Sequence, residues 1–379
     1  MRYLTIVFAM LCWIPLACKE QRMTTKTAFP PVPVEIPFTK GQIVHLFPVL
    51  RENSIGLVYG ERWAITRIDK TEIQLDNFPE NEFSIPTAIA LPQKDPDFLY
   101  VRTPKSVDLL NWKTKRQEAY FMDISKSLGI GIEISKVVDY QKGITLSVFF
   151  HDDEDMEFHY YFVLDDILNK KRLKEIPLPG FSNELPVYFT PSYTIYRPGW
   201  HSQWRALDND LNQTIHPLVD LLNKDTSSAV LAVLNDNMFV SEELRHALII
   251  TYNKTARKDM LFLARWYGIP EIVPVPMAIN DGERLMKSPN RNTMSPSGRW
   301  VYFAVDGGRT RKDTHYLVYL DPKLPSGFLA PFKLDFEGDV DLASWVTVPE
   351  GLVLYRNGQL AYYDLSHFDP KQPVEKLNK

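Results

Sequence analysis

The sequence has few cysteines, little glycine and no surplus of charge of one sign. Only 2 of its 379 residues are cysteine, so no disulfide framework can stabilise the bulk of the chain. Lys and Arg number 43 against 47 Asp and Glu, which excludes a protein held on nucleic acid by phosphate contacts. Hydrophobic residues make up 45%, too many for a disordered chain, and the mean hydropathy of -0.22 excludes a polytopic membrane protein.

Familiar catalytic and metal-binding motifs are also missing. The chain has no His-Glu-x-x-His zinc helix, no Gly-x-Ser-x-Gly elbow, no Gly-Lys-Ser/Thr phosphate loop and no paired Cys ligands. The densest acidic run, His151–Asp155, lacks the glycine and the alternate spacing of a calcium loop, so we interpret it as a solvated hairpin tip. The sequence therefore predicts no cofactor and no bound metal.

The one long apolar run lies at the N-terminus. Arg2 precedes the apolar residues 4–14, a layout typical of a secretory signal and too short for a comfortable membrane span of about 20 residues. The following Leu-Ala-Cys, ending in Ala17 and Cys18, resembles a bacterial lipobox, although Pro15 stands where that pattern prefers Leu. The resemblance implies cleavage between Ala17 and Cys18 and lipidation of Cys18. An uncleaved signal anchor and a plain secreted protein are the alternatives.

The cysteine count agrees with lipidation. Cleavage before Cys18 removes Cys12, and the lipid consumes the one sulfur that remains. At about 0.8 kcal/mol per buried CH₂, two or three acyl chains give a stable membrane anchor. Lys19 follows Cys18, where many enteric lipoproteins kept at the inner membrane have Asp, so the resemblance favours the periplasmic face of the outer membrane.

The prolines divide the chain into a tether and a folded part. Proline (28) exceeds glycine (17), and Pro30, Pro31 and Pro33 favour an extended, semi-rigid path. We therefore expect a signal peptide at 1–17, a lipidated tether at 18–40 and one folded domain at 41–379.

The folded part repeats a β-rich pattern seven times. The first marker of each copy starts 42 to 54 residues after the previous one, a spacing that suits a four-stranded propeller blade. These markers are residues 56–59, 98–101, 146–150, 194–196, 248–252, 300–303 and 352–355. A second strand follows each marker and usually closes on Asp, whose side chain can hydrogen-bond the next turn. These second strands are residues 63–69, 106–111, 160–165, 203–208, 261–266, 316–321 and 360–364.

A third segment follows in each copy, and proline recurs in several of these segments. Proline cannot donate to a ladder, so this segment is predicted to be the outermost strand of its blade. The segments are residues 72–75, 118–121, 175–179, 214–218, 271–276, 331–334 and 373–377. A fourth strand lies upstream of each marker. The pattern predicts an all-β, seven-bladed β-propeller of four-stranded blades, with two stacked β-domains as the alternative.

One copy carries a more specific signature. The run Met294–Phe303, Met-Ser-Pro-Ser-Gly followed by an apolar strand, and the later strand 316–321 ending in Asp resemble the WD40-like repeat of periplasmic TolB-type propellers. Ser297 replaces the Asp usual in that repeat. Either 33–37 or 373–377 could supply the strand that closes the ring.

Aromatic residues suggest packing more than ligand binding. Seven tryptophans follow the signal, and six of the seven predicted blades hold at least one, which suits contacts between blades. The exception is Trp200 and His201 with Trp204, two indoles near a Pro-Gly turn, which we single out as a candidate ligand site.

The sequence thus predicts a lipid-anchored propeller of the bacterial cell envelope. It would act as a scaffold for a protein or ligand, held on the membrane through the lipid at Cys18, with an envelope protein as partner and no nucleic acid. The competing class is a carbohydrate-active or other hydrolase or lyase with acid and base residues at the channel mouth.

Overall fold

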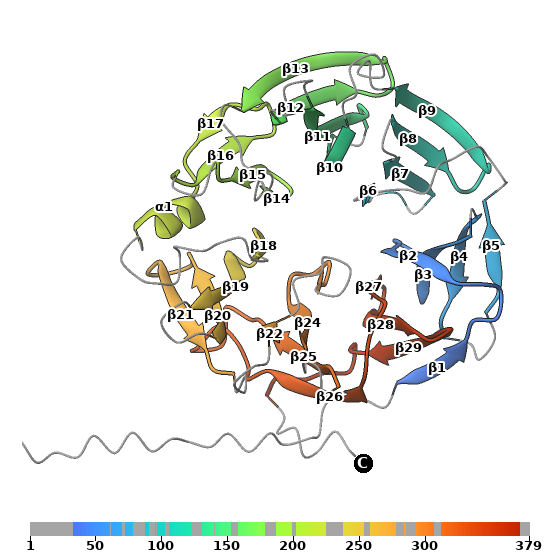
Figure 1. Cartoon of the computed structure of the whole chain (residues 1–379), viewed down its shortest axis with the longest axis vertical. Helices are drawn as coiled ribbons and strands as arrows, with labels where there is room; N and C mark the ends of the chain where they lie inside the picture. The colour runs from blue at the N-terminus through green and yellow to red at the C-terminus, as the bar shows by residue number, and fades with distance from the viewer. Residues whose placement is uncertain are drawn as a thin grey trace, which may run out of the picture.

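The computed structural model is a closed ring of seven β-sheets arranged like the blades of a propeller (Figure 1). It describes residues 33–60, 62–69, 73–78, 88–90, 95, 97–102, 106–122, 131–139, 141–152, 158–178, 187–198, 202–224, 238–253, 258–277, 284–285, 293–306 and 312–371. The predicted signal peptide, with Ala17 and Cys18, and most of the predicted tether lie outside these residues.

Blades 1 to 4 each have four antiparallel strands, given from the channel outwards. Blade 1 contains β2 (Ile43–Pro48), β3 (Ser54–Tyr59), β4 (Arg62–Arg67) and β5 (Leu75–Asn77). Blade 2 contains β6 (Ala88–Ala90), β7 (Phe98–Arg102), β8 (Ser106–Asn111) and β9 (Arg116–Met122). Blade 3 contains β10 (Gly131–Asp139), β11 (Ile144–Asp152), β12 (Phe158–Asp166) and β13 (Lys171–Leu178). Blade 4 contains β14 (Val187–Phe189), β15 (Tyr193–Tyr196), β16 (Arg205–Asp208) and β17 (Gln213–Thr214).

Blades 5 to 7 complete the ring. Blade 5 contains β18 (Met238–Ser241), β19 (His246–Asn253), β20 (Lys258–Arg265) and β21 (Glu271–Val275). Blade 6 has five strands, because β22 (Arg284–Leu285) and β23 (Thr293–Met294) both pair with β24 (Trp300–Asp306), which β25 (Thr314–Tyr319) and β26 (Phe332–Glu337) follow. Blade 7 contains β27 (Leu342–Thr347), β28 (Glu350–Arg356), β29 (Gln359–Asp364) and β1 (Val34–Pro37).

The ring is closed by the N-terminal strand. Val34 pairs with Tyr362 and Pro37 with Gln359, so β1 is the outermost strand of blade 7. Of the two segments that could close the ring, 33–37 is therefore the one that does, while 373–377 lies outside the described residues. Strand β1 starts at Val34 and thus lies within the segment 18–40 that was expected to be a tether.

The hydrophobic core is divided among the seams between blades. Each of the seven seams has its own cluster of buried side chains. In β7, Leu99 and Val101 pack toward blade 1, whereas the intervening Tyr100 packs toward blade 3. Strand residues alternate between two faces, so a middle strand buried on both faces reads as a continuous apolar run. Seven such seams require a single ring, which excludes two stacked β-domains.

Three of the predicted outer-strand segments place a proline in an outermost strand. Pro177 and Pro274 are in the outermost strands β13 and β21, and Pro37 is in β1. One prediction was wrong: residues 214–218 form only the short β17 before α1 (Pro217–Lys224) begins. This helix, on the outside of the ring between blades 4 and 5 (Figure 1), is the one helix in the described part of the chain. It is too short and too polar to cross a membrane.

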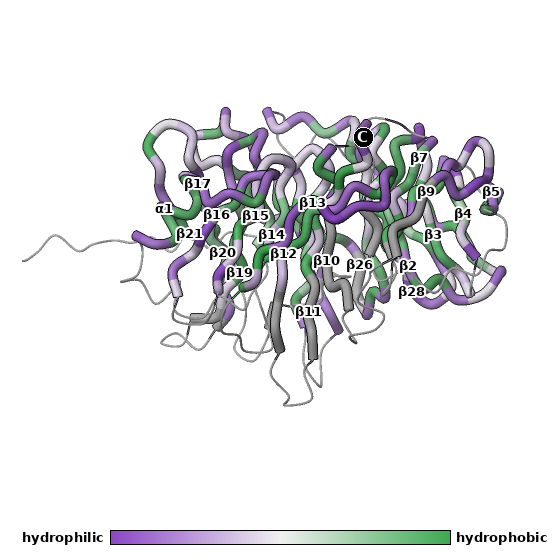
Figure 2. Tube along the Cα trace, turned by 90° about the horizontal axis from the view of Figure 1, so that it is seen from above, coloured by the Kyte–Doolittle hydropathy of each residue, from purple (hydrophilic) through white to green (hydrophobic). Residues whose placement is uncertain are grey.

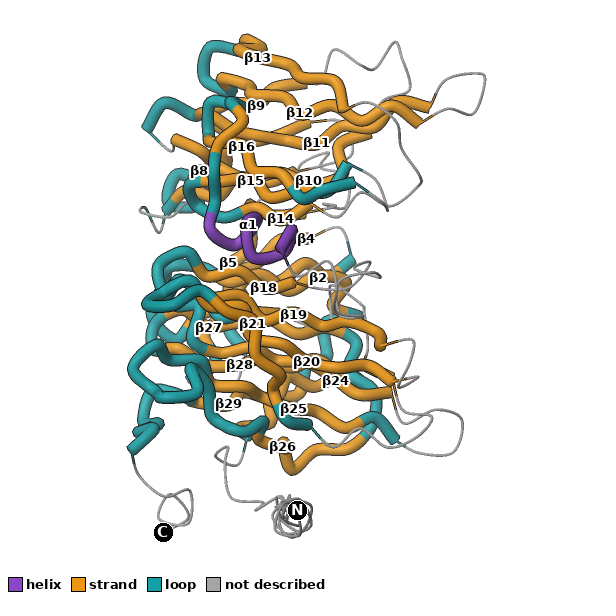
Figure 3. The backbone as a smooth tube through the Cα atoms, turned by 90° about the vertical axis from the view of Figure 1, so that its left-hand side faces the viewer, coloured by secondary structure: helices purple, strands orange, loops and turns teal. Residues whose placement is uncertain are grey.

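The ring has two faces, which we call face A and face B. Face A carries the turns between the first and second and between the third and fourth strands of each blade, such as 49–53, 190–192, 295–299 and 347–350. Face B carries the other connections, such as the turn Asn357–Gly358 between β28 and β29. The described turns of face A gather along the left side of the ring in Figure 3. Many of them are hydrophilic, with the green apolar strands between the two faces (Figure 2).

Candidate functional site

A charged network joins blades 1 and 2 on face A. Arg51, in the turn after β2, lies 3.3 Å from Asp76 of β5 and 3.1 Å from Asp97 of blade 2. Asp76 also accepts hydrogen bonds from Lys115 Nζ at 2.6 Å and from the indole N–H of Trp112 at 3.0 Å. Burial disfavours the ionised form of Asp76, but these bonds and the neighbouring cations outweigh it, so the pKa of Asp76 lies below its usual value. Asp76 is therefore an ion-pair partner at neutral pH.

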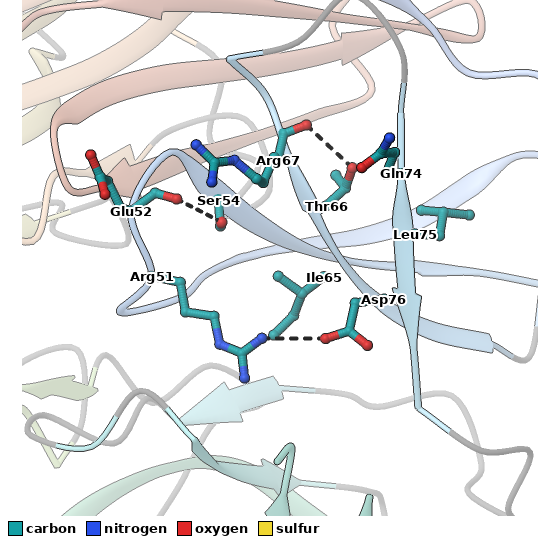
Figure 4. A pocket seen from close by; sticks show the side chains of 9 residues that line it. All are labelled: Arg51, Glu52, Ser54, Ile65, Thr66, Arg67, Gln74, Leu75 and Asp76. Carbon is teal, nitrogen blue, oxygen red and sulfur yellow. Dashed lines mark hydrogen bonds and ion pairs between the residues drawn. The ribbon is translucent and has the colours of Figure 1, made fainter.

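This network borders a polar recess in blade 1. The cavity has a volume of about 610 Å³ and is lined by Arg51, Glu52, Ser54, Ile65, Thr66, Arg67, Gln74, Leu75 and Asp76 (Figure 4). Arg51 points toward Asp76 on one side, and Arg67 extends toward Ser54 on the other (Figure 4). Arg67 is held by Asp69, at 3.0 Å from Nε and 2.5 Å from Nη2. Cations and carboxylates thus line one recess, which suits a polar ligand bearing both charges or a charged segment of a partner.

Glutamates from neighbouring blades cap two equivalent turns on face A. In blade 4, Glu242 of blade 5 accepts hydrogen bonds from Thr190 Oγ1 at 2.7 Å and from the Ser192 N–H at 3.1 Å. In blade 6, Glu350 of blade 7 accepts from Ser297 Oγ at 2.9 Å and from the Ser297 N–H at 3.2 Å. Both turns read Ser/Thr-Pro-Ser. In both turns a glutamate of the next blade therefore supplies the carboxylate that binds the turn.

The fourth residue of the blade 6 turn must be glycine. Gly298 has a φ of 71°, in the left-handed region, and a Cβ there would lie 2.2 Å from Ser241 Oγ of blade 5. Its carbonyl oxygen lies 3.1 Å from His246 Nε2. Burial lowers the pKa of His246 to about 4, so this histidine is neutral at physiological pH and acts as a structural link between blades 5 and 6.

Lys136 links blade 3 to blade 4 beside the 190–192 turn, at the rim of face A. Its Nζ donates to the carbonyl oxygens of Thr190 and Tyr193, each at 2.9 Å, and to Asn209 Oδ1 at 2.7 Å. The side chain is 8% exposed, and this burial lowers its pKa to about 8, partly opposed by the charge of Glu242. All three ammonium hydrogens have acceptors, so the group is held as a cation and is not presented as a nucleophile.

The candidate ligand site near the Pro-Gly turn is only partly described. Trp204 is buried at 4% exposure, its backbone N–H donates to Asn223 Oδ1 at 2.8 Å, and its ring packs against Tyr188 with centroids 6.0 Å apart. The structure thus places Trp204 in the core between blades 4 and 5. Trp200 and His201 lie outside the described residues, so a shared ligand site for the three stays a prediction.

Other sequence-based expectations have mixed outcomes. Five tryptophans, Trp63, Trp112, Trp204, Trp300 and Trp345, are buried at seams, as the packing interpretation predicts. Within the described residues no group of three or more His, Cys, Asp or Glu side chains could hold a metal ion. The acidic tip at 153–155 lies outside those residues, as do Ala17 and Cys18.

The sequence missed the residues that build the rim of face A. Lys136, Glu242 and Glu350 act on partners 50 to 73 residues away in the chain, so no local spacing marks them. The one available signal was the Ser/Thr-Pro-Ser turn, which occurs in both blades where a glutamate of the next blade binds. Comparison with known protein-family models finds no match, and a search of curated proteins also finds no match.

Proposed function

We propose that this chain is a lipid-anchored binding scaffold of the bacterial cell envelope. The fold supports a scaffold, because a closed propeller holds its loops on a rigid ring and gives varied surfaces at both faces. The resemblance of residues 294–321 to TolB-type repeats supports a periplasmic setting, and Lys19 supports the outer membrane. The partner is an envelope protein or a polar ligand.

The observation that carries the proposal is the place of β1. This edge strand of the ring starts at Val34, 16 residues after Cys18 of the lipobox-like Ala17-Cys18 sequence. Ile36 of that strand is fully buried in the seam between blades 7 and 1. An anchor at Cys18 would therefore connect to the folded ring through a strand that is itself part of the core.

An enzyme with acid and base groups at the channel mouth is the second candidate. A glycosidase-like site requires one carboxylic acid whose pKa is raised, close to a second carboxylate. Asp76, one of the two carboxylates that line the recess on face A, has a lowered pKa and is bound to cations. This recess therefore favours binding over proton transfer.

The test is crosslinking in intact membranes followed by pull-down of the full chain. Wild-type protein should fractionate with membranes and recover the same partner in repeated preparations, whereas Cys18→Ser should leave the membrane fraction and lose that partner. Unchanged mass and membrane association of the Cys18→Ser chain would refute the lipid anchor. Hydrolysis or cleavage of envelope glycans by the purified chain would favour the enzyme instead.

A further inference from the structure

The N-terminal segment meets the ring at face A. Strand β1 runs from Val34, opposite Tyr362, to Pro37, opposite Gln359. Gln359 follows the Asn357–Gly358 turn on face B, so Val34 is the end of β1 nearer face A. Cys18 is 16 residues before Val34, so about 55 Å of extended chain is the longest reach between them. An anchor at Cys18 thus holds the ring by the rim of face A.

Four of the seven exposed large hydrophobic side chains of the described residues stand on the same face, whereas Ile215, 81% exposed, lies toward face B in blade 4. Leu168, Ile269 and Val348 are 44%, 83% and 49% exposed and lie in face A turns of blades 3, 5 and 7. Val34, at the face A end of β1, is 46% exposed. Single exposed aliphatic residues are ordinary, but several at turn tips around one face of a ring are typical of contact with an apolar or interfacial surface.

Lysines flank the exposed leucine of blade 3. Two turns meet there, because the Ile167 N–H donates to the Gly143 carbonyl at 3.0 Å and Leu168 covers Gly143. Lys142, beside Gly143, has a side chain that is 76% exposed and is paired with Asp139 at 3.5 Å. Lys170 lies in the same turn as Leu168, and Lys171 is the first residue of β13. Both lysines are exposed. An aliphatic tip among lysines matches the boundary between phosphate groups and acyl chains.

The other two tips have polar neighbours. Arg265, just before the loop that carries Ile269, connects this loop to the next blade, because its Nη1 donates to the Pro325 carbonyl at 3.0 Å. Lys323, two residues before Pro325, is exposed. Val348 lies beside the recess, because the Asn53 N–H donates to its carbonyl at 2.6 Å and Glu52 lines the recess. The recess, with Arg51 and Arg67 as well as carboxylates, suits a phosphate-bearing headgroup.

We propose that face A rests on a phospholipid surface that contains anionic headgroups. This inference rests on the proposed lipid anchor and adds an orientation to it. The aliphatic tips reach the interface, the lysines of blade 3 meet lipid phosphates, and face B is turned away from the bilayer toward the partner. Basic side chains near an anionic surface add binding that salt weakens.

The test uses the full chain, purified from membranes and reconstituted into vesicles of phosphatidylethanolamine and phosphatidylglycerol. Single substitutions Leu168→Cys and Ile269→Cys on face A, and Thr39→Cys on face B, each carry a polarity-sensitive fluorophore. Lipids brominated in their acyl chains then serve as quenchers. Both face A labels should be quenched at least about threefold more strongly than the face B label, since quenching requires contact with the acyl region. Adding Lys142→Glu and Lys170→Glu should reduce quenching at position 168, whereas the matched Lys40→Glu on face B should not.

The outcomes distinguish the orientation of the ring from the lipid anchor. Equal quenching on the two faces, or stronger quenching on face B, would refute the orientation while leaving the anchor in place. Face A labels shielded from both lipid and aqueous iodide would show that a second copy covers this face, and would also refute it. If Cys18→Ser chains still float with vesicles and keep face A quenched, the anchor is wrong and the surface contact stands. A wild-type chain that does not float refutes both.

Discussion

At the scale of residues, hydrogen bonds between blades offset the free-energy cost of burying a charge. Lys136 is 8% exposed, yet it keeps three acceptors from blade 4. An ammonium group in such a place must be hydrogen-bonded at every hydrogen, because an unsatisfied buried charge costs several kcal/mol. Lys136 thus fixes the register of two blades at the rim of face A.

The pKa of Lys136 predicts a dependence of stability on pH. Its folded value of about 8 lies below the ordinary 10.5, so between these pH values the unfolded chain binds more protons than the folded one. Stability contributed through Lys136 should therefore rise with pH across this window, by up to about 3 kcal/mol. Urea unfolding of wild type and Lys136→Met from pH 7.5 to 10.5 measures it, and the difference between them should grow in favour of wild type.

Comparison with the variant is needed because tyrosines titrate in the opposite sense. Burial raises the pKa of Tyr100 and of Tyr362 to about 12, so ionisation of the unfolded chain near pH 10 lowers stability in both proteins. A difference between wild type and Lys136→Met that stays constant with pH would contradict the assigned shift.

The glutamate caps give a second prediction at this scale. Glu350→Ala removes the carboxylate that accepts both Ser297 hydrogen bonds. The half-buried backbone N–H of Ser297 then loses this acceptor. The loss should lower the free energy of unfolding by about 1 to 2 kcal/mol. Glu243→Ala, at an exposed position in blade 5, should change it by less than about 0.5 kcal/mol. Equal effects of the two substitutions in urea unfolding would show that the cap contributes nothing.

At the scale of elements, strand β1 has a larger effect than its four residues suggest. Ile36 is fully buried among side chains of blades 7 and 1, whereas Val34 of the same strand is 46% exposed. Ile36→Ala should cost about 2 to 4 kcal/mol through lost contacts and a cavity, and Val34→Ala under about 1 kcal/mol. Thermal unfolding checks both. If truncation of residues 372–379 were the more damaging change, the C-terminal segment would be the one that closes the ring.

Most strands could be predicted from the sequence because their apolar runs reflect burial on both faces. The Asp that closes many second strands does bind the next turn: Asp208 accepts from the Asn212 N–H at 2.8 Å, and Asp364 from the Ser366 N–H at 2.8 Å. In blade 3 the turn is bound by the residue after the predicted Asp165. Asp166 accepts the Asn169 N–H, whereas Asp165 is buried and paired with Arg172. A one-residue offset reverses the face of a strand, and the letters alone do not mark it.

Helix α1 was missed although its start has a local signal. Pro217 is the first helical residue, a position that suits proline, and the preceding His216 accepts the Leu218 N–H at Nδ1. His216 is a rare capping residue. Its ring also packs between the rings of Tyr193 and Trp266, with centroid distances of 4.8 and 5.5 Å. The proline of this copy was interpreted as an edge-strand proline because it recurs at that place in other blades. The segment forms a helix because its apolar side chains pack between blades 4 and 5.

At the scale of the whole molecule, each blade buries its two faces only against its neighbours. Every core cluster is shared by two blades, so no blade has a core of its own. The ring should therefore unfold as one cooperative unit, unlike an open repeat array. Far-ultraviolet circular dichroism and fluorescence of the seam tryptophans should give the same urea midpoint. Two separated transitions would contradict a single closed ring.

The proposed scaffold depends on the link between the ring and the membrane. Its most direct test is the intact mass of the chain purified from membranes, compared with the Cys18→Ser chain. Lipidation at Cys18 predicts a wild-type chain that begins at Cys18 and carries the added mass of a diacylglyceryl group and an amide-linked acyl chain. A wild-type chain that retains residues 1–17, or that carries no lipid and remains in the soluble fraction, would contradict it.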